Sequence, residues 1–262
     1  MKLSISNIGW SADKDYLLYE AMARMGYSGL EIAPSRIFSE NPYDHKNEAS
    51  AWAKKICRNF NLSISSMQSI WYGRKEMLFG SVEERELLFA YTMKAVDFAN
   101  AIGCGNLVFG SPVNRRISES DDPNHAIPFF KKIGDYAITR GTVIAIEANP
   151  PIYNTNYIND TVSALELIDA VGSDGFRLNL DTGTMIENKE NINDICRKAY
   201  LINHVHISEP YLQCIQKRPI HQEIASMLRD SDYKGFISIE VGRQNSIEPL
   251  IQMMDYIKEI FE

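Results

Sequence analysis

Cysteine is scarce in this chain of 262 residues, which has only four. They are Cys57, Cys104, Cys196 and Cys214, and no two of them form a Cys-x-x-Cys pair. Such pairs are the usual signature of thiolate metal sites and of dithiol redox motifs. Neither kind of site is therefore predicted, and we expect four reduced thiols.

Clusters of basic residues and long apolar stretches are also missing. The formal net charge is -7, and Lys and Arg form no run of the kind that nucleic-acid-binding surfaces require. No stretch approaches the roughly 18 uninterrupted apolar residues of a membrane span, and the opening residues 1–7 are too short an apolar run for a signal peptide. We therefore expect a cytoplasmic protein that binds neither nucleic acid nor a membrane.

Glycine and proline, at 15 and 10 residues, are too few to indicate a linker or a disordered arm. The length is close to the roughly 250 residues typical of a (β/α)8 barrel, and it is enough to bury a sizeable core. We therefore expect one domain covering residues 1–262. The sequence is compatible with a homo-oligomer but does not define one.

What the chain does contain is a strict alternation of short β-type runs and longer amphipathic segments. The β-type runs are residues 3–8, 29–33, 62–67, 106–110, 142–147, 176–181, 201–208 and 236–241. The helical segments are residues 14–25, 47–60, 82–102, 124–140, 161–171, 191–199, 221–229 and 246–260. Repeated βα units predict an α/β protein with a (β/α)8 TIM barrel, and a doubly wound open sheet is the alternative.

The last strands alternate apolar and polar residues. In residues 176–181, Asn179 and Asp181 share the face opposite the apolar side chains, and residues 201–208 place His204 and His206 in the same way. Because helices cover the outside of a barrel, the apolar face must point outward and the polar face inward. The C-terminal half is therefore predicted to have a polar interior.

Four consecutive strands each end in a residue that can bind a hard metal ion: Glu147, Asp181, His206 and Glu240. In a barrel these ends converge on one part of the C-terminal rim, where barrel enzymes place their active sites. Three carboxylates and one imidazole suit a single Mn²⁺, Mg²⁺, Co²⁺ or Zn²⁺ ion and leave positions for substrate oxygens. The alternative is four ordinary interior polar groups, but three inward carboxylates without a cation would repel one another.

Short motifs around these residues extend over nearly the whole chain. They are Gly-Tyr-Ser-Gly-Leu-Glu-Ile at 26–32, Ile-Glu-Ala-Asn-Pro at 146–150, Leu-Asp-Thr-Gly at 180–183, His-Val-His-Ile-Ser-Glu-Pro at 204–210 and Tyr-Lys-Gly-Phe-Ile-Ser-Ile-Glu at 233–240. In their order and placement the chain resembles the xylose isomerase-like barrel superfamily. That group includes sugar isomerases, epimerases, inosose dehydratases and repair nucleases of the endonuclease IV type.

The resemblance implies that the same four residues hold one divalent metal and that Glu147 and Glu240 also act as acid and base. The implied function is a metal-dependent isomerase or epimerase that acts on a sugar, sugar phosphate or sugar acid through a metal-stabilised enediolate. An inosose-dehydratase-like lyase, or a barrel that binds metal and carbohydrate without turnover, is the alternative.

Three positions depart from the relatives. Endonuclease IV relatives have a His where this chain has Thr184, which argues against a nuclease. The ketose 3-epimerases typically have a Glu six residues after the first metal ligand and an Arg six residues after the metal His, and these places are Tyr153 and Leu212 here. This difference argues against epimerisation of a free ketohexose.

Substrate contacts are predicted at six further residues near the strand ends: Gln68, Trp71, Asn149, Glu209, His221 and Arg243. Trp71, with its neighbour Tyr72, could form a wall for a sugar ring, and Arg243 could bind a phosphate or carboxylate. For each of these residues, packing or solvation without a ligand is the alternative. Glu31, inward by parity, is expected to orient a barrel partner.

Overall fold

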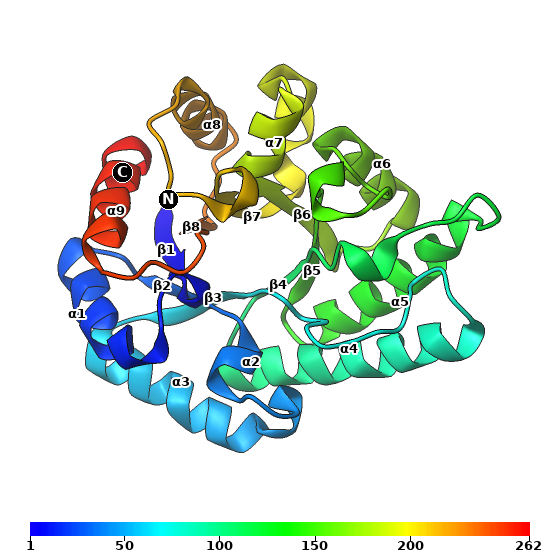
Figure 1. Ribbon diagram of the computed structural model, residues 1–262, viewed down its shortest axis with the longest axis horizontal. Helices are drawn as coiled ribbons and strands as arrows, with labels where there is room; N and C mark the ends of the chain where they lie inside the picture. The colour runs from blue at the N-terminus through cyan, green and yellow to red at the C-terminus, as the bar shows by residue number, and fades with distance from the viewer.

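Eight parallel strands form a closed barrel in the computed structural model, which describes residues 1–262 (Figure 1). The strands are β1 (Lys2–Ser6), β2 (Gly29–Ile32), β3 (Ser63–Met67), β4 (Asn106–Phe109), β5 (Val143–Glu147), β6 (Phe176–Asp181), β7 (Ile202–Ile207) and β8 (Phe236–Ile239). Strand β8 pairs in parallel with β1 and so closes the sheet. The predicted (β/α)8 barrel is confirmed, and an open doubly wound sheet is excluded.

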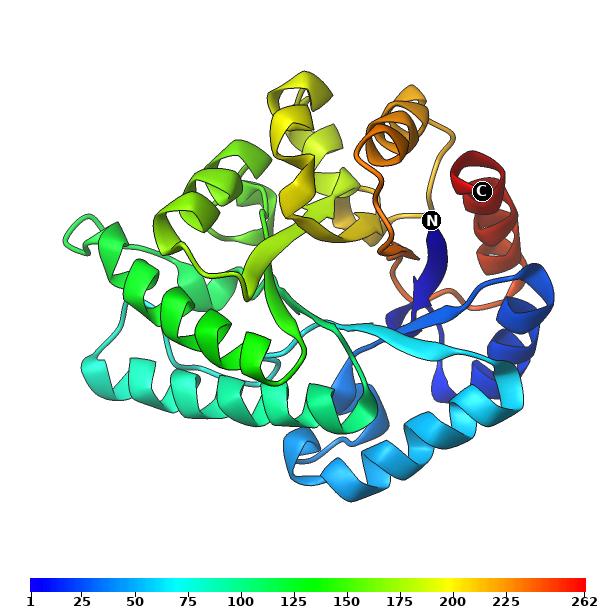
Figure 2. The same ribbon diagram turned by 180° about the vertical axis from the view of Figure 1, so that it is seen from behind.

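Helices surround the barrel on the outside, as the two opposite views show (Figures 1 and 2). They are α1 (Asp15–Met25), α2 (Pro34–Ile37), α3 (Lys46–Phe60), α4 (Val82–Ile102), α5 (Ala126–Thr139), α6 (Thr161–Val171), α7 (Thr182–Asn188), α8 (Pro219–Asp230) and α9 (Glu248–Phe261). A continuous core of 67 buried apolar residues fills the space between strands and helices. None of these helices combines the length and the apolar character that crossing a membrane requires.

Local signals set the helix ends. Ser81 and Glu84 form a reciprocal capping box at the start of α4, which satisfies backbone N–H groups that have no partner within the helix. Gly103, with a φ of 70°, ends the same helix in the left-handed conformation that glycine adopts without strain. The bounds of α4 and α6 are those that the sequence predicts.

The segment between β6 and β7 differs from the prediction of one helix over residues 191–199. Helix α7 begins directly after β6, because the Asp181 side chain accepts a hydrogen bond from Thr184 N and caps it. Residues 191–199 contribute only to two 3-10 helices, Ile192–Asp194 and Cys196–Leu201. The prediction of an α-helix there was therefore wrong. The spacing of apolar residues fits both helix types and does not distinguish them.

The interior of the barrel is polar, as the strand parity predicts. Asp181 pairs in register with His206, and His206 pairs with Ser238, so these side chains lie in one layer. Towards the other side of the barrel, Ser4 Oγ lies 2.6 Å from Ser65 Oγ. Polar groups therefore line the space below the C-terminal rim.

Candidate metal centre

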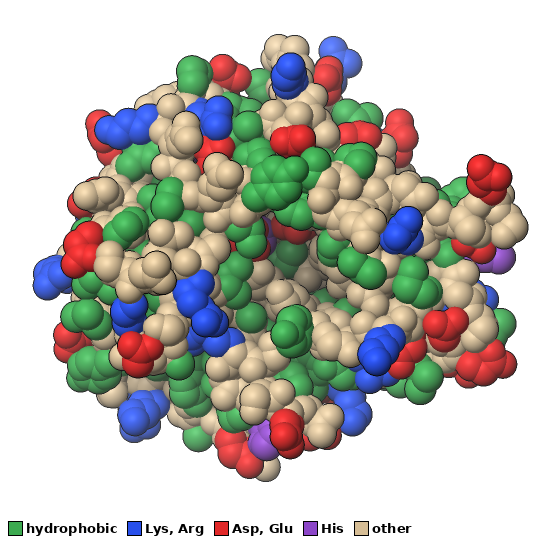
Figure 3. Space-filling model, viewed as in Figure 1, with side chains coloured by type: hydrophobic (Ala, Val, Ile, Leu, Met, Phe, Trp, Pro, Cys, Tyr) green, Lys and Arg blue, Asp and Glu red, His purple; other side chains and the backbone are tan.

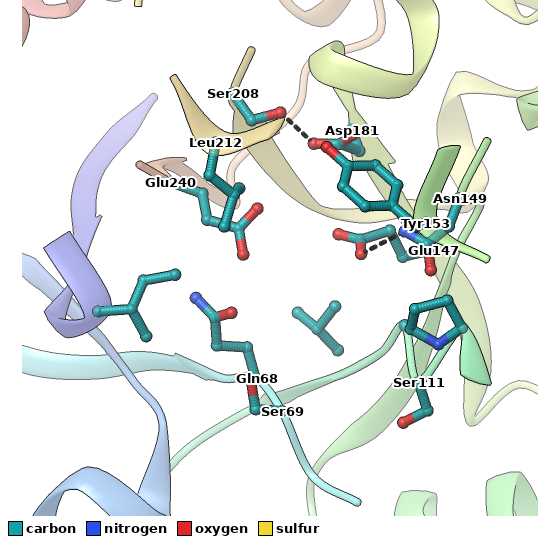
Figure 4. A pocket seen from close by; sticks show the side chains of 14 residues that line it. Gln68, Ser69, Ser111, Glu147, Asn149, Tyr153, Asp181, Ser208, Leu212 and Glu240 are labelled. Atoms are coloured by element: carbon teal, nitrogen blue, oxygen red, sulfur yellow. Dashed lines mark hydrogen bonds between the residues drawn. The ribbon is translucent and has the colours of Figure 1, made fainter. Parts of the chain in front are cut away.

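The four predicted ligands come together at the C-terminal rim. Glu147 and Asp181 are the last residues of β5 and β6, His206 lies in β7, and Glu240 follows β8 directly. One donor atom from each residue lies within 4.8 Å of the others. The side chains of Glu147, Asp181 and Glu240 point into one cavity (Figure 4). This is the spacing at which a single cation could contact all four donors.

The His206 imidazole is fixed on both sides. Its Nδ1 lies 2.9 Å from Glu147 Oε1 and 3.3 Å from Glu240 Oε2, whereas its Nε2 lies 2.9 Å from Glu31 Oε2. Histidines that bind metals usually donate their other ring N–H to a carboxylate, which fixes the tautomer and the ring orientation. Glu31 therefore engages Nε2, and Nδ1 is the ring nitrogen that could bind a cation.

Glu31 is a fully buried carboxylate beneath the site. Burial alone would raise its pKa, but His206 and His204 hold the pKa of Glu31 well below its ordinary value. Gln68 Nε2 donates to Glu31 Oε1 over 3.0 Å, and His204 Nε2 lies 2.9 Å from Oε2. Glu31 is thus an ionised group that orients His206, in agreement with the role expected from its inward position.

Asp181 has partners on both oxygens. Thr184 donates to Oδ2 through its backbone N–H, at 2.7 Å, and through its hydroxyl, at 2.9 Å. The Ser208 hydroxyl donates to Oδ1. These bonds fix the carboxylate at the cavity, so that the residue capping α7 is also a candidate metal ligand.

Glu147 is held by two amides and a buried arginine. Asn179 donates to Oε1 over 2.7 Å, and Asn149 donates to Oε2 over 3.0 Å. Arg115, fully buried in the loop after β4, donates to Asn149 Oδ1 and to the Glu147 carbonyl oxygen. The sequence does not mark Arg115 as a site residue. It lies beside Arg116 in a polar segment, which is typical of a solvated loop.

The pKa shifts in the cluster follow from burial and from the shared negative charge. Burial and the Glu147 charge raise the pKa of Asp181 to about 6. Burial, with the Glu147 and Asp181 charges, raises the pKa of Glu240 to about 7. Burial opposes ionisation of Glu147 as well, but His206 and Asn149 hold its pKa below the ordinary value. Three crowded carboxylates with one imidazole are a donor set that a hard divalent cation fits.

The cavity above these residues has a volume of about 230 Å³. It opens at the centre of the rim, where acidic side chains are visible inside the hollow (Figure 3). Its lining residues are Ile8, Gln68, Ser69, Val108, Gly110, Ser111, Pro112, Glu147, Asn149, Tyr153, Asp181, Ser208, Leu212 and Glu240. No lysine or arginine is among them.

Two of the six predicted substrate contacts, Gln68 and Asn149, line this cavity, and the other four do not. Trp71 is 2% exposed, packs edge-to-face on Phe109 and donates from Nε1 to Thr92. Trp71 therefore packs in the apolar core and does not form a wall of the cavity, whereas its neighbour Tyr72 is exposed.

Glu209, His221 and Arg243 lie outside the cavity lining. The buried Glu209 carboxylate accepts two hydrogen bonds of 2.7 Å from Arg218. His221 is buried, with Nδ1 3.0 Å from the Tyr256 hydroxyl. Arg243 is exposed. Charge and aromatic type alone could not separate these residues from cavity residues.

Tyr153 and Leu212, the two positions that depart from the ketose 3-epimerases, both line the cavity (Figure 4). Tyr211 N donates to the Tyr153 hydroxyl over 2.8 Å, which ties the loop after β5 to the loop after β7. Tyr211 and Leu212 have φ values of 60° and 53°, in the left-handed region. The departures therefore change the wall of the candidate site itself.

A closed (β/α)8 barrel with a polar centre at its C-terminal mouth is the class that the fold and site define. The chain belongs to the xylose isomerase-like TIM barrel family, whose model matches residues 19–260. A search of curated proteins by sequence finds no match.

Several solved structures share the fold at low sequence identity. D-psicose 3-epimerase from Clostridium cellulolyticum H10, solved with D-tagatose, is 17% identical, with a TM-score of 0.79 and 100% of each chain covered. The 3-keto-D-glucoside 4-epimerase of E. coli is also 17% identical, with a TM-score of 0.75, and the match covers 99% of this chain and 98% of that one. The IOLI protein, solved with a zinc atom, is 16% identical, with a TM-score of 0.76 and 100% of each chain covered.

Proposed function

We propose that the protein is a divalent-metal-dependent isomerase or epimerase of an uncharged sugar. The observation that carries the proposal is the pair of carboxylates, Glu147 and Glu240, which face each other across the cavity beside Asp181 and His206 (Figure 4). Glu147, Asp181, His206 Nδ1 and Glu240 would hold the ion. When bound, it would make a hydrogen on a carbon next to a carbonyl acidic enough for a carboxylate to remove.

The two glutamates differ in their surroundings, which suggests different roles. Glu147 accepts hydrogen bonds from two amides, and such bonds favour the ionised form that a base needs. The Glu240 carboxylate accepts no amide hydrogen bond, and its Oε2 lies 3.3 Å from His206 Nδ1. We assign proton removal to Glu147 and proton return to Glu240, on opposite faces of the substrate.

The lining of the cavity supports an uncharged sugar over a sugar phosphate or sugar acid. A phosphate or carboxylate in a desolvated site requires a paired cation, usually an arginine. Here the lining has three acidic residues and no basic one. Its neutral hydrogen-bonding groups, Gln68, Ser111 and Asn149, suit sugar hydroxyls.

The solved structures of similar fold support the same class of reaction. Two of those reported above are described as sugar epimerases, and one of these was solved with D-tagatose. The zinc atom in the IOLI protein is consistent with a metal-dependent family member.

The test is turnover of uncharged ketoses and keto-glycosides by the protein loaded in turn with Mn²⁺, Co²⁺, Mg²⁺ or Zn²⁺, followed by mass spectrometry and proton NMR in heavy water. A product that has the substrate's mass when it is made in ordinary water, and that carries deuterium at the changed carbon when it is made in heavy water, supports the proposal. Loss of water would instead identify a lyase, and saturable binding without any product would identify a carbohydrate-binding barrel. Complete retention of the substrate hydrogen would exclude the two glutamates as solvent-exchanging bases.

A further inference from the structure

A second hollow adjoins the candidate metal centre on the β2 and β3 side of the mouth. Its volume is about 230 Å³, the same as that of the metal cavity. It is lined by Ser35, Ser39, Asn41, Pro42, Tyr43, Ser69, Tyr72, Gly73, Arg74 and Tyr91. These residues come from α2 and the segment that follows it, from the loop after β3, and from α4.

Ser69 lines both hollows, so the two lie next to each other at this residue. It follows Gln68 directly, at the edge of the metal cavity (Figure 4). Its φ of 55° is in the left-handed region, and this turns the chain sharply after β3. A ligand that extends out of the metal cavity over Ser69 would therefore reach the second hollow.

The loop after β3 is fixed while one aromatic ring projects from it. Ile70 and Trp71 are 1% and 2% exposed, whereas the next residue, Tyr72, is 72% exposed. The Tyr43 hydroxyl donates to the Ile70 carbonyl oxygen over 2.8 Å and so anchors the loop. Tyr72 is thus a large apolar surface on a rigid support, exposed beside a hollow.

The wall of the second hollow combines aromatic faces with neutral hydrogen-bonding groups. Tyr72 and Tyr91 supply rings, while Ser35, Ser39 and Asn41 supply hydroxyl and amide groups. The Arg74 charge is paired with Glu76, and its guanidinium lies 4.8 Å from the centre of the Tyr91 ring. A hexose ring has an apolar face and hydroxyls at its edge, which matches such a wall.

We propose that this second hollow is a subsite for a further sugar unit, with Tyr72 as its stacking platform. The substrate is then a glycoside of two or more units, whose keto-bearing unit occupies the metal cavity. This inference rests on the proposed function, because it takes the occupant of the metal cavity to be a sugar.

The test compares disaccharides that contain a ketose unit, lactulose, turanose and isomaltulose, with fructose. Binding is measured by saturation-transfer NMR and calorimetry on the full chain with Mg²⁺ present. At least one disaccharide is expected to bind about tenfold more tightly than fructose. Tyr72→Ala should remove this difference, and Tyr72→Phe should keep it because the ring face remains.

Tyr200→Ala is the matched control, since Tyr200 is 71% exposed in a 3-10 helix that contributes to neither hollow. Equal affinity for all disaccharides and fructose, or an unchanged preference in Tyr72→Ala, would overturn the subsite. Turnover distinguishes the two proposals. Turnover of a monosaccharide without any preference for disaccharides refutes the subsite alone. A preference that depends on Tyr72, without turnover of any sugar, supports the subsite and refutes the proposed catalysis.

Discussion

The two halves of the barrel contribute different chemistry to the mouth. Strands β5 to β8 end in the four candidate ligands, Glu147, Asp181, His206 and Glu240. Strands β1 to β4 and the residues that follow them contribute uncharged cavity residues such as Gln68, Ser69 and Gly110, and two buried charged residues outside the lining, Glu31 and Arg115. The C-terminal half therefore supplies the reactive groups.

The N-terminal half supports that centre and shapes it. Glu31 fixes His206 from across the barrel, and Gln68 donates to Glu31. At Gly110, an added Cβ would lie 2.9 Å from Glu147 Oε2, so any larger residue would displace the Glu147 carboxylate. The candidate metal centre at the ends of β5 to β8 therefore depends on residues in β2 and after β3 and β4.

The largest expected effect is in the reactive half. Glu240→Gln keeps the side-chain size and one oxygen but cannot carry a proton, so kcat should fall at least about 100-fold with saturating metal. Metal content, measured by elemental analysis, should remain near that of the unchanged protein at saturating metal. A kcat within a few-fold of normal would show that proton transfer does not pass through Glu240.

A smaller effect is expected in the supporting half. Glu31→Gln removes the charge that orients His206 but leaves every proposed ligand in place. Loss of such a supporting carboxylate typically lowers metal affinity by about 10- to 100-fold. Calorimetric titration with Zn²⁺ or Mn²⁺ measures this, and thermal unfolding of the metal-free variant controls for misfolding. An unchanged affinity in a folded variant would mean that the two halves act independently.

The pH dependence of metal binding distinguishes the halves further. The raised pKa values of Glu240, about 7, and Asp181, about 6, mean that protons compete with the cation near neutral pH. The metal-binding forms are deprotonated, and neighbouring carboxylates also raise the pKa of His206, so affinity should fall by at least about tenfold per pH unit as the pH falls through this range. Titrations at pH 8, 7 and 6 measure the trend. A metal affinity that does not change between pH 8 and pH 6 would mean that neither carboxyl is protonated in this range.

The smallest effect concerns Asp181, which both caps α7 and faces the cavity. Asparagine caps helices about as well as aspartate, whereas alanine costs about 1 kcal/mol. Metal-free Asp181→Ala should therefore be less stable than Asp181→Asn by about this amount in urea unfolding. Both variants should show weakened metal binding. Equal stability of the two variants would show that the cap contributes little.

The strand order and the convergence of the four strand ends could be predicted because both follow from periodicity along the chain. The cavity wall could not, since it depends on loop conformation. Trp71 and Tyr72 are neighbours of similar chemistry, yet one is buried and the other exposed. The buried Arg115 guanidinium donates to Asn149 and to the carbonyl oxygens of Glu147 and Ile158. Such partners come from other loops, and a single sequence does not reveal them.

The backbone at Tyr211 and Leu212 has a consequence for how long a ligand stays bound. Two successive residues other than glycine in the left-handed region cost about 1–3 kcal/mol each, so the segment is held by its contacts. The hydrogen bond from Tyr211 N to the Tyr153 hydroxyl is one of them. A ligand that displaces the Tyr153 side chain would release this segment to a relaxed conformation. The residence time of such a ligand would then depend on the conformation of the loop after β7, although the Tyr153 ring comes from the loop after β5.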